Sequence, residues 1–366
     1  MAAGSLKVDW AAGLHRAVTM LHFGKWEEKE EAAKVIAKLA EEDVKRRRVM
    51  AELGVIPPLV AMVGSEVAAR RRLAVKALIE VANGSSTNKA SMVEAGLLSR
   101  LPKNTTAIED DDESSNQELA HLLLSISSLS KTQFFLQPPG IIPTAVSILQ
   151  SNPNLDTTQA CLATLHNLSS LLDNAATLSS TKLIDILITM SCSIAKGASE
   201  KALSTLANLV ITAPGRAAIE RHHAVPEGLI EIMTRGERPR CQELSAYVLM
   251  MLAHQSSLQR RKMADAGIVR VLLEVGLLGS PLAQKRAMKI LQWFKDDRQK
   301  PQVTRRMSSF GSPDVGENCK ILMKKIVKQS LNKNMETITR RASGAEDSSS
   351  RIKALVISSS SKSLPY

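Results

Sequence analysis

Few residues of this sequence have the types and spacing of a catalytic or metal site. The adjacent pair His222-His223 could supply a metal ligand or a general base. Adjacent residues of a helix point about 100° apart, and no Cys or carboxylate stands at ligand spacing from the pair, so we interpret it as a surface loop. Phosphate-binding glycine loops and nucleophile elbows are also missing. The sequence therefore predicts no enzyme, no metal and no cofactor.

The cysteines do not change this prediction. Their spacings of 31, 49 and 78 residues match no zinc, redox or disulfide pattern, and we expect small hydrophobic side chains in a reducing compartment. The four are Cys161, Cys192, Cys241 and Cys319.

Three serines near the end of the chain are candidate phosphorylation sites. Ser308, Ser309 and Ser343 each follow an arginine by three residues, the spacing that basophilic kinases use. A phosphate there would reduce the positive charge of the surrounding segment. From Ser343 onward the chain is rich in serine, and we expect it to be disordered.

The same segment contains a basic amphipathic pattern at 317–341. Apolar residues recur along a roughly helical stripe, and lysines cover the remaining surface. Such a helix can bind calmodulin or an anionic membrane, or it can pack on the preceding domain and cover its exposed end. The sequence leaves these alternatives open. The residues that define the pattern are Lys320, Leu322, Lys324, Lys325, Ile326, Lys328 and Leu331.

Charge divides the chain into a balanced body and a basic tail. Residues 295–366 hold 15 Lys or Arg and 7 Asp or Glu, a net charge of +8, whereas the first 294 residues hold 33 and 29, a net charge of +4. A body this close to neutrality is not built for nucleic acid. No run of about 18 uncharged apolar residues indicates a membrane span. We expect a soluble intracellular protein, in the cytoplasm, the nucleus or both.

The body repeats itself about every 40 residues. Glu52-Leu-Gly-Val-Ile returns as Glu94-Ala-Gly-Leu-Leu, and related sequences begin at Gly140 and Asp265. With aromatics at 3% and abundant Leu, Ile, Val and Ala, the composition favours helices. Each unit is expected to hold three helices, with a left-handed glycine such as Gly54 before the third and Pro57 opening that helix. One unit cannot bury its apolar face alone, so the prediction is an α-solenoid.

We expect six units and a partial seventh between residues 25 and 294. An N-terminal helix at 1–24 would cap the first unit, an acidic insertion occupies 103–113, and the basic tail fills 295–366. The units are 25–65, 66–103, 114–151, 154–191, 194–234, 237–277 and 279–294.

This pattern resembles the armadillo repeat, on the evidence of Glu52-Leu-Gly-Val-Ile-Pro-Pro-Leu-Val60, Ala163-Thr-Leu-His-Asn-Leu-Ser169 and Leu203-Ser-Thr-Leu-Ala-Asn-Leu209. The resemblance implies a right-handed all-α solenoid. More narrowly, the chain resembles the repeat region of plant U-box ubiquitin ligases. Because the repeats begin near residue 25 and the tail is irregular, we expect no U-box and do not transfer ligase activity.

The resemblance also implies a concave groove lined by one helix of each unit. In peptide-binding armadillo proteins, an Asn near the end of that helix binds the backbone of an extended ligand. Two of six units keep it, too few for a nuclear-import receptor. The groove positions are Asn167 and Asn208, with Lys38, Glu80, Ser128 and Met251 as their equivalents.

Several other patterns are expected to be structural. We interpret the arginine clusters 46–48 and 70–72 as solvated faces, the acidic run 109–113 as a solvated loop, and the Leu-rich strings 119–123 and 168–172 as core. The sequence therefore predicts a non-catalytic scaffold or adaptor for protein partners. Two alternatives stay open: a ubiquitin-pathway component that recognises substrates without its own ligase domain, and a regulator that responds to membranes or calmodulin through the tail.

Overall fold

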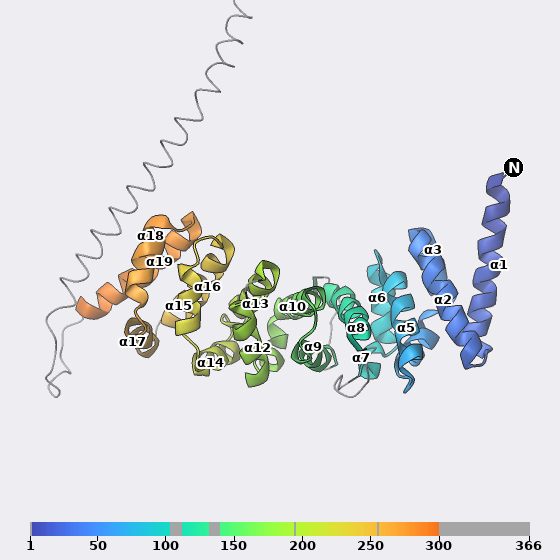
Figure 1. The fold of residues 1–366 in the computed structure, drawn as a ribbon, viewed down its shortest axis with the longest axis horizontal. Helices are drawn as coiled ribbons and strands as arrows, with labels where there is room; N and C mark the ends of the chain where they lie inside the picture. Colours follow the sequence, from blue (N-terminus) through green and yellow to red (C-terminus); the bar gives the residue numbers. More distant parts are fainter. Residues whose placement is uncertain (1, 103–111, 132–139, 194, 255, 300–366) are drawn as a thin grey trace, which may run out of the picture.

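The chain folds into an elongated stack of helices that follow one another from end to end (Figure 1). The computed structural model describes residues 2–102, 112–131, 140–193, 195–254 and 256–299. Over these residues it contains α-helices, two short 3-10 helices and no strand. The elements are α1 (Ala2–Phe23), α2 (Trp26–Glu42), α3 (Val44–Glu52), α4 (Ile56–Val63), α5 (Ala68–Ala82), α6 (Ser86–Glu94), α7 (Leu97–Arg100), α8 (Asp112–Ser127), η1 (Ser128–Lys131), α9 (Ile141–Gln150), α10 (Leu155–Ser169), η2 (Leu172–Asn174), α11 (Ala175–Leu178), α12 (Thr181–Ser191), α13 (Lys196–Leu209), α14 (Ala213–Arg221), α15 (Glu227–Thr234), α16 (Pro239–Ala253), α17 (Ser257–Asp265), α18 (Ile268–Leu278) and α19 (Pro281–Gln299).

A long helix begins each unit, and we call these the ladder helices: α2, α5, α8, α10, α13, α16 and α19. Each ladder helix packs beside the next one. The third helix of a unit, such as α12 or α15, packs on the ladder helix that follows it. The unit thus lacks a complete core of its own and obtains one from its neighbour, as expected for a solenoid.

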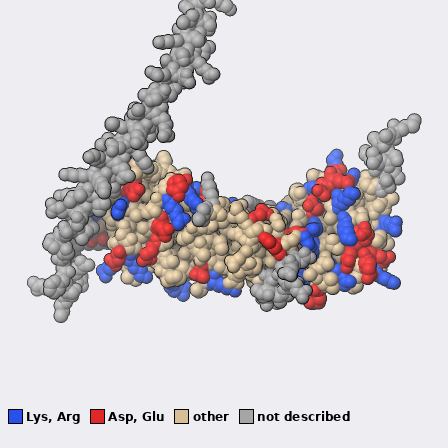
Figure 2. Space-filling view, in the orientation of Figure 1, with Lys and Arg blue, Asp and Glu red and all other residues tan. Residues whose placement is uncertain are grey.

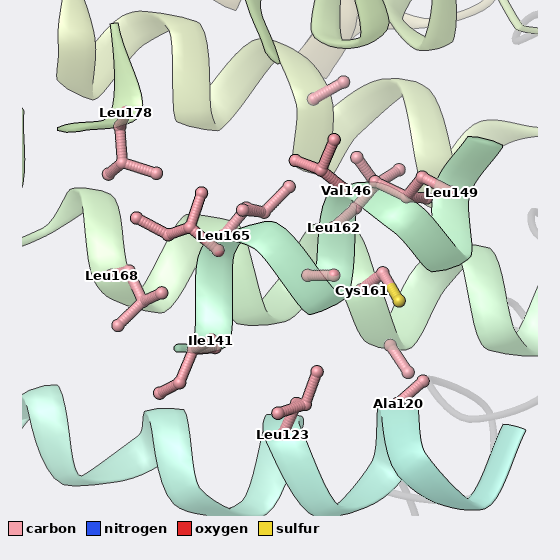
Figure 3. Close-up of a cluster of buried hydrophobic side chains, with 14 of the residues drawn as sticks. Ala120, Leu123, Ile141, Val146, Leu149, Cys161, Leu162, Leu165, Leu168 and Leu178 are labelled. Carbon is pink, nitrogen blue, oxygen red and sulfur yellow. The ribbon is translucent and has the colours of Figure 1, made fainter. Parts of the chain in front are cut away.

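The apolar core runs continuously along the stack. Figure 3 shows one section of it, where Leu162 and Leu165 of α10 lie among side chains of the two helices before it. Those neighbours include Leu123 of α8 and Ile141 of α9, and all four side chains are fully buried or nearly so. Leu, Ile, Val and Ala fill this space in place of aromatic rings, as the composition predicted.

The repeated glycines have two different structural reasons. Gly54, Gly96 and Gly267 adopt left-handed backbone conformations with φ of 76°, 86° and 75°, which confirms the prediction made for Gly54. Gly140 differs, because its φ is −88°. A Cβ at Gly140 would lie 2.3 Å from the backbone oxygen of Leu98, so here glycine allows the chain to approach α7 closely.

A polar side chain on the second helix of most units closes the carboxyl end of the preceding ladder helix. We call these side chains the end clamps. Each donates a hydrogen bond to a backbone oxygen that the helix itself leaves unsatisfied. The pairs are Arg47 with Ala40 (2.6 Å), Asn88 with Val81 (2.9 Å), Asn174 with Leu168 (3.0 Å), Arg216 with Val210 (3.3 Å) and Arg260 with Ala253 (2.6 Å).

The end clamps correct one expectation. Arg47 is buried and does not belong to a solvated face: its Nη1 also donates to the backbone oxygen of Asn83 at 2.8 Å, in the next unit. Arg48 is exposed, as expected. Arg260 similarly reaches forward to Asp297 of α19, at 2.5 Å from Nε. These two clamps therefore tie the ends of neighbouring ladder helices together.

The first ladder helix is covered by α1. Leu14, Ala17 and Leu21 of α1 are buried, and α1 packs along α2 (Figure 1). None of the helices in the described part of the chain is both long and apolar enough to cross a bilayer.

Candidate protein-binding surface

The ladder helices together form a continuous surface, which we call the ladder face. The predicted groove residues lie along it, one for each of six successive units: Lys38 on α2, Glu80 on α5, Ser128 in η1 directly after α8, Asn167 on α10, Asn208 on α13 and Met251 on α16. Lys38 is exposed, Asn167 is buried, and the other four are half-buried.

The two asparagines link neighbouring ladder helices. The amide nitrogen of Asn167 donates to the Ser127 hydroxyl on α8 at 3.0 Å, and that of Asn208 donates to the Ser169 hydroxyl on α10 at 2.9 Å. Asn167 is only 7% exposed, so part of its hydrogen-bonding capacity is used within the fold. Asn208 is half-buried, and its amide has a second proton besides the one bonded to Ser169.

At the α2 and α5 end, the ladder face is charged and internally paired. Arg70 pairs with Glu30 of α2 at 2.7 Å, and its guanidinium lies 4.7 Å from the ring centroid of Trp26. Arg72 pairs with Glu118 of α8 at 3.0 Å. Both arginines are half-buried bridges between units, which corrects the expectation of a simple solvated face.

The middle of the ladder face carries little charge. Half-buried side chains here include Leu124 of α8, Ala163 of α10 and Ser204 of α13. Figure 2 shows that the surface over α10, α12 and α13 is mostly uncharged, and that charged side chains gather toward both ends. A further polar contact joins α8 and α10: Nε2 of His121 lies 2.9 Å from Oδ2 of Asp156. Hydrogen bonds from His121 and Gln117 lower the pKa of Asp156.

Toward α19 the ladder face becomes aromatic and cationic. The Arg286 guanidinium lies 4.9 Å from the ring centroid of Tyr247, and its Nη1 donates to the backbone oxygen of Glu243 at 2.6 Å. Burial lowers the pKa of Arg286. The ring centroid of Trp293 is 5.3 Å from that of His254 and 5.7 Å from Nζ of Lys289. Tyr247 and Trp293 thus lie on two adjacent ladder helices and His254 directly follows the first of them, a combination that no repeat motif indicates in the sequence.

The remaining candidates lie elsewhere. His222 hydrogen-bonds Asp185 of α12 at 3.0 Å and stacks on His223, where it follows the end of α14. No group of three potential metal ligands occurs among the described residues. The Leu-rich string 119–123 is core, as predicted, but Leu172 of the second string is 64% exposed. Cys161 is buried, which raises the pKa of its thiol to about 12.

All of the tail predictions concern residues outside the described part of the chain. They comprise the candidate phosphorylation sites Ser308, Ser309 and Ser343, and the basic pattern Lys320, Leu322, Lys324, Lys325, Ile326, Lys328 and Leu331. Most of the acidic insertion 103–113 is outside as well.

Comparison with known proteins places this geometry in a family. The model of the plant U-box protein ARM repeat region matches residues 103–312, more than half of the chain. The chain belongs to this family. It is 24% identical over 269 residues to U-box domain-containing protein 45 of Arabidopsis thaliana. That alignment covers 72% of this chain but 34% of the relative, so the chain spans about a third of the length of that relative.

The solved structures that resemble this chain include engineered and designed proteins. The crystal structure of one engineered protein has a TM-score of 0.50 at 19% identity, over 76% of this chain and 78% of that chain. A designed armadillo repeat protein has a TM-score of 0.41 at 15% identity, over 76% and 99%. Another, in complex with the peptide (KR)4, has a TM-score of 0.36 at 16% identity, over 77% and 99%. The all-α armadillo solenoid predicted from the sequence is confirmed.

Proposed function

We propose that this protein is a non-catalytic scaffold that binds protein partners along the ladder face. The observation that carries the proposal is the continuity of that face over seven stacked ladder helices. An extended segment of a partner could contact several units at once. The interaction would then be a sum of modest contributions, and no single residue of the described chain would have to supply chemistry.

The ladder face also supports a specific kind of partner. Its α2 and α5 end offers charges that already pair with one another, so they attract a ligand only weakly. Its α16 and α19 end offers Tyr247 and Trp293 beside the cations Arg286 and Lys289. Aromatic residues and arginine are the usual anchors of protein interfaces. We infer a partner segment that places an apolar or aromatic side chain and a carboxylate at this end.

The proposal is tested by placing two arginines on the ladder face and, as a control, two arginines on the third helices. Ser204→Arg with Met251→Arg places two bulky cations on α13 and α16, where both parent residues are half-buried. Thr189→Arg with Thr234→Arg adds the same side chains at exposed positions of the third helices α12 and α15. Both tagged variants and the parent chain are used for quantitative affinity purification from plant cells, after circular dichroism has shown equal helix content.

The expected result is that partners held by the parent chain are retained by the Thr189 and Thr234 variant. The same partners should decrease at least about tenfold with the ladder-face variant, which corresponds to about 1.4 kcal/mol. Equal recovery of every partner by both variants would refute binding through the ladder face.

Membership of the U-box repeat family favours a second function, the recognition of substrates for ubiquitination. Here the ladder face would hold a substrate, and a ligase domain on another polypeptide or segment would perform the transfer. Purified protein incubated with ubiquitin, activating enzyme and conjugating enzyme should not modify itself. Adding a U-box ligase that co-purifies with it should restore ubiquitin transfer to the bound partner. Self-ubiquitination by the chain alone would contradict this assignment.

A further inference from the structure

The cations at the α19 end of the ladder face lack the carboxylate partners that cations at the other end have. Arg70 and Arg72 each pair with a glutamate. Among the described residues, no carboxylate lies within ion-pair distance of Lys285, Arg286 or Lys289 of α19. Lys289 follows the other two by four and three residues, so it neighbours both on the helix surface. Like charges at this spacing repel one another, and this side of α19 therefore carries an unbalanced positive charge.

One part of the Arg286 guanidinium is held by the fold, and one edge of it is free. Its Nη1 donates to the backbone oxygen of Glu243 at 2.6 Å, and its central carbon lies 4.9 Å from the ring centroid of Tyr247. Nε and Nη2 donate to no atom of the described chain. Both nitrogens reach solvent, because neither belongs to the buried side-chain atoms that lack a partner. Nε and Nη2 form the edge of an arginine that can bind two oxygens of one anion.

The carboxylate of Glu243 near this edge is already occupied by other donors. Its Oε1 accepts from the Ser280 hydroxyl at 2.6 Å, and its Oε2 lies 3.3 Å from Nη1 of Arg240. Lys289 has no carboxylate partner, and its Nζ lies 5.7 Å from the ring centroid of Trp293. An aromatic ring attracts a cation but does not neutralise its charge. Aromatic rings and a backbone oxygen thus position the cations of α19 and leave their charge for an anion from outside.

We propose that Arg286 and Lys289, with Lys285 beside them, bind a phosphate monoester on a side chain of the partner segment. The proposal rests on the proposed function, and it assigns a phosphate, in preference to a carboxylate, to the anion expected at this end. A carboxylate has one charge and two oxygens, which the free edge of Arg286 would satisfy alone. A phosphate monoester carries a charge of about −1.5 to −2 at pH 7 and has a third oxygen for Lys289. Cβ atoms three residues apart on a helix are about 5–6 Å from each other, so one phosphate can contact both side chains.

Peptide capture by the immobilised full chain tests the proposal. A protease digest of plant-cell proteins is divided into two halves, and one half is treated with phosphatase. Each half is passed over the protein, and the retained peptides are identified by mass spectrometry. Phosphopeptides should be enriched at least about tenfold over their share of the untreated digest. The dephosphorylated forms of the same peptides should not be retained from the treated half.

Two matched pairs of variants distinguish this site from a general attraction to positive charge. Arg286→Lys keeps the charge but removes the planar edge, so it should reduce phosphopeptide capture at least about fivefold. Arg261→Lys makes the same exchange at an exposed position of α17 and should leave capture unchanged. Lys289→Gln should reduce capture about threefold relative to Lys262→Gln, which removes the same charge from α17. If Arg286→Lys lowers the unfolding temperature, the Lys289 and Lys262 pair decides, because both of these lysines are exposed.

Three results would overturn the proposal. The first is no enrichment of phosphopeptides, whether or not other peptides are retained. The second is capture that phosphatase leaves unchanged, because the bound anion would then be a carboxylate. The third is phosphatase-sensitive capture that neither Arg286→Lys nor Lys289→Gln reduces, because cations elsewhere in the chain would then hold the phosphate. Partner recovery with the ladder-face variant is measured separately, so failure of this proposal can be told apart from failure of the proposed function.

Discussion

Replacing the two kinds of repeat glycine should give different and separable losses of stability. At Gly96 a Cβ would meet no atom within 4 Å, so Gly96→Ala costs only the left-handed conformation at φ 86°, about 1–2 kcal/mol. At Gly140 the backbone conformation suits any residue, but a Cβ would lie 2.3 Å from the Leu98 oxygen and 3.1 Å from its carbonyl carbon. The backbone must then move, and overpacking of this kind costs about 1–3 kcal/mol.

The two alanine variants alone would be hard to tell apart, so the decisive variants carry asparagine. Asparagine tolerates the left-handed region, and the open space at Gly96 accommodates its side chain. Gly96→Asn should therefore recover much of the stability that Gly96→Ala loses. Gly140→Asn should be at least as destabilised as Gly140→Ala, because a larger group meets the same backbone oxygen.

The measurement is urea unfolding followed by circular dichroism, with hydrogen exchange to locate the change. Repeat proteins can unfold in parts, so the exchange data decide which helices respond. Faster exchange should be confined to α6 and α7 for Gly96 variants and to α7 and α9 for Gly140 variants. If asparagine restored as much stability at Gly140 as at Gly96, the two glycines would not have the different roles assigned to them.

Four further predictions follow from single contacts. Arg47→Met should lower the free energy of unfolding by about 2–3 kcal/mol in urea titrations, because the backbone oxygens of Ala40 and Asn83 lose a charged donor, whereas Arg48→Met at an exposed position should change it little. Asn208→Leu should cost about 1 kcal/mol by removing the bond to Ser169, and Ser169→Ala should add almost nothing to that variant in a double-mutant cycle. The pKa of Asp156 is lowered in the folded chain, so its carboxylate contributes a small amount to stability at neutral pH. This contribution should disappear as the pH falls through the lowered pKa. The free energies of unfolding of the parent chain and of Asp156→Asn should therefore differ at pH 7 and converge in acid. In the native protein, iodoacetamide should modify half-buried Cys192 well before Cys161, because burial raises the pKa of the Cys161 thiol to about 12. Peptide mass spectrometry measures the order of modification, and earlier modification of Cys161 would contradict the prediction.

The fold was largely predictable because it depends on patterns that recur. Apolar residues three and four apart located the ladder helices, and Gly54 with Pro57 correctly placed a left-handed turn before a third helix. Gly140 shows the limit of this reasoning. Its place in the repeated motif predicted the same turn, but its role depends on the distance to Leu98 in another unit, which no local pattern contains.

The surface was less predictable, because burial depends on neighbours that lie about 40 residues away. Arg47 looked like part of a solvated basic cluster, yet it is buried against two helix ends. Asn167 matched a groove motif, but its amide binds Ser127 of the preceding ladder helix. The aromatic end of the ladder face combines Tyr247 and Trp293 from different units. The sequence offered one signal for an end clamp. It is a polar residue about seven positions beyond the last apolar residues of a ladder helix.

The end clamps also bear on how such a chain can be rebuilt during evolution or in the laboratory. Arg260 needs the carboxylate of Asp297, so this clamp is matched to a side chain of the unit that follows it, whereas Arg47 donates to a backbone oxygen at Asn83. Asn88 in turn donates back to the backbone oxygen of Arg47. A unit moved to a new place, duplicated or deleted would keep its helices but lose its matched neighbour. Exchange of the unit that holds Arg260 should therefore succeed only when Asp297 travels with it.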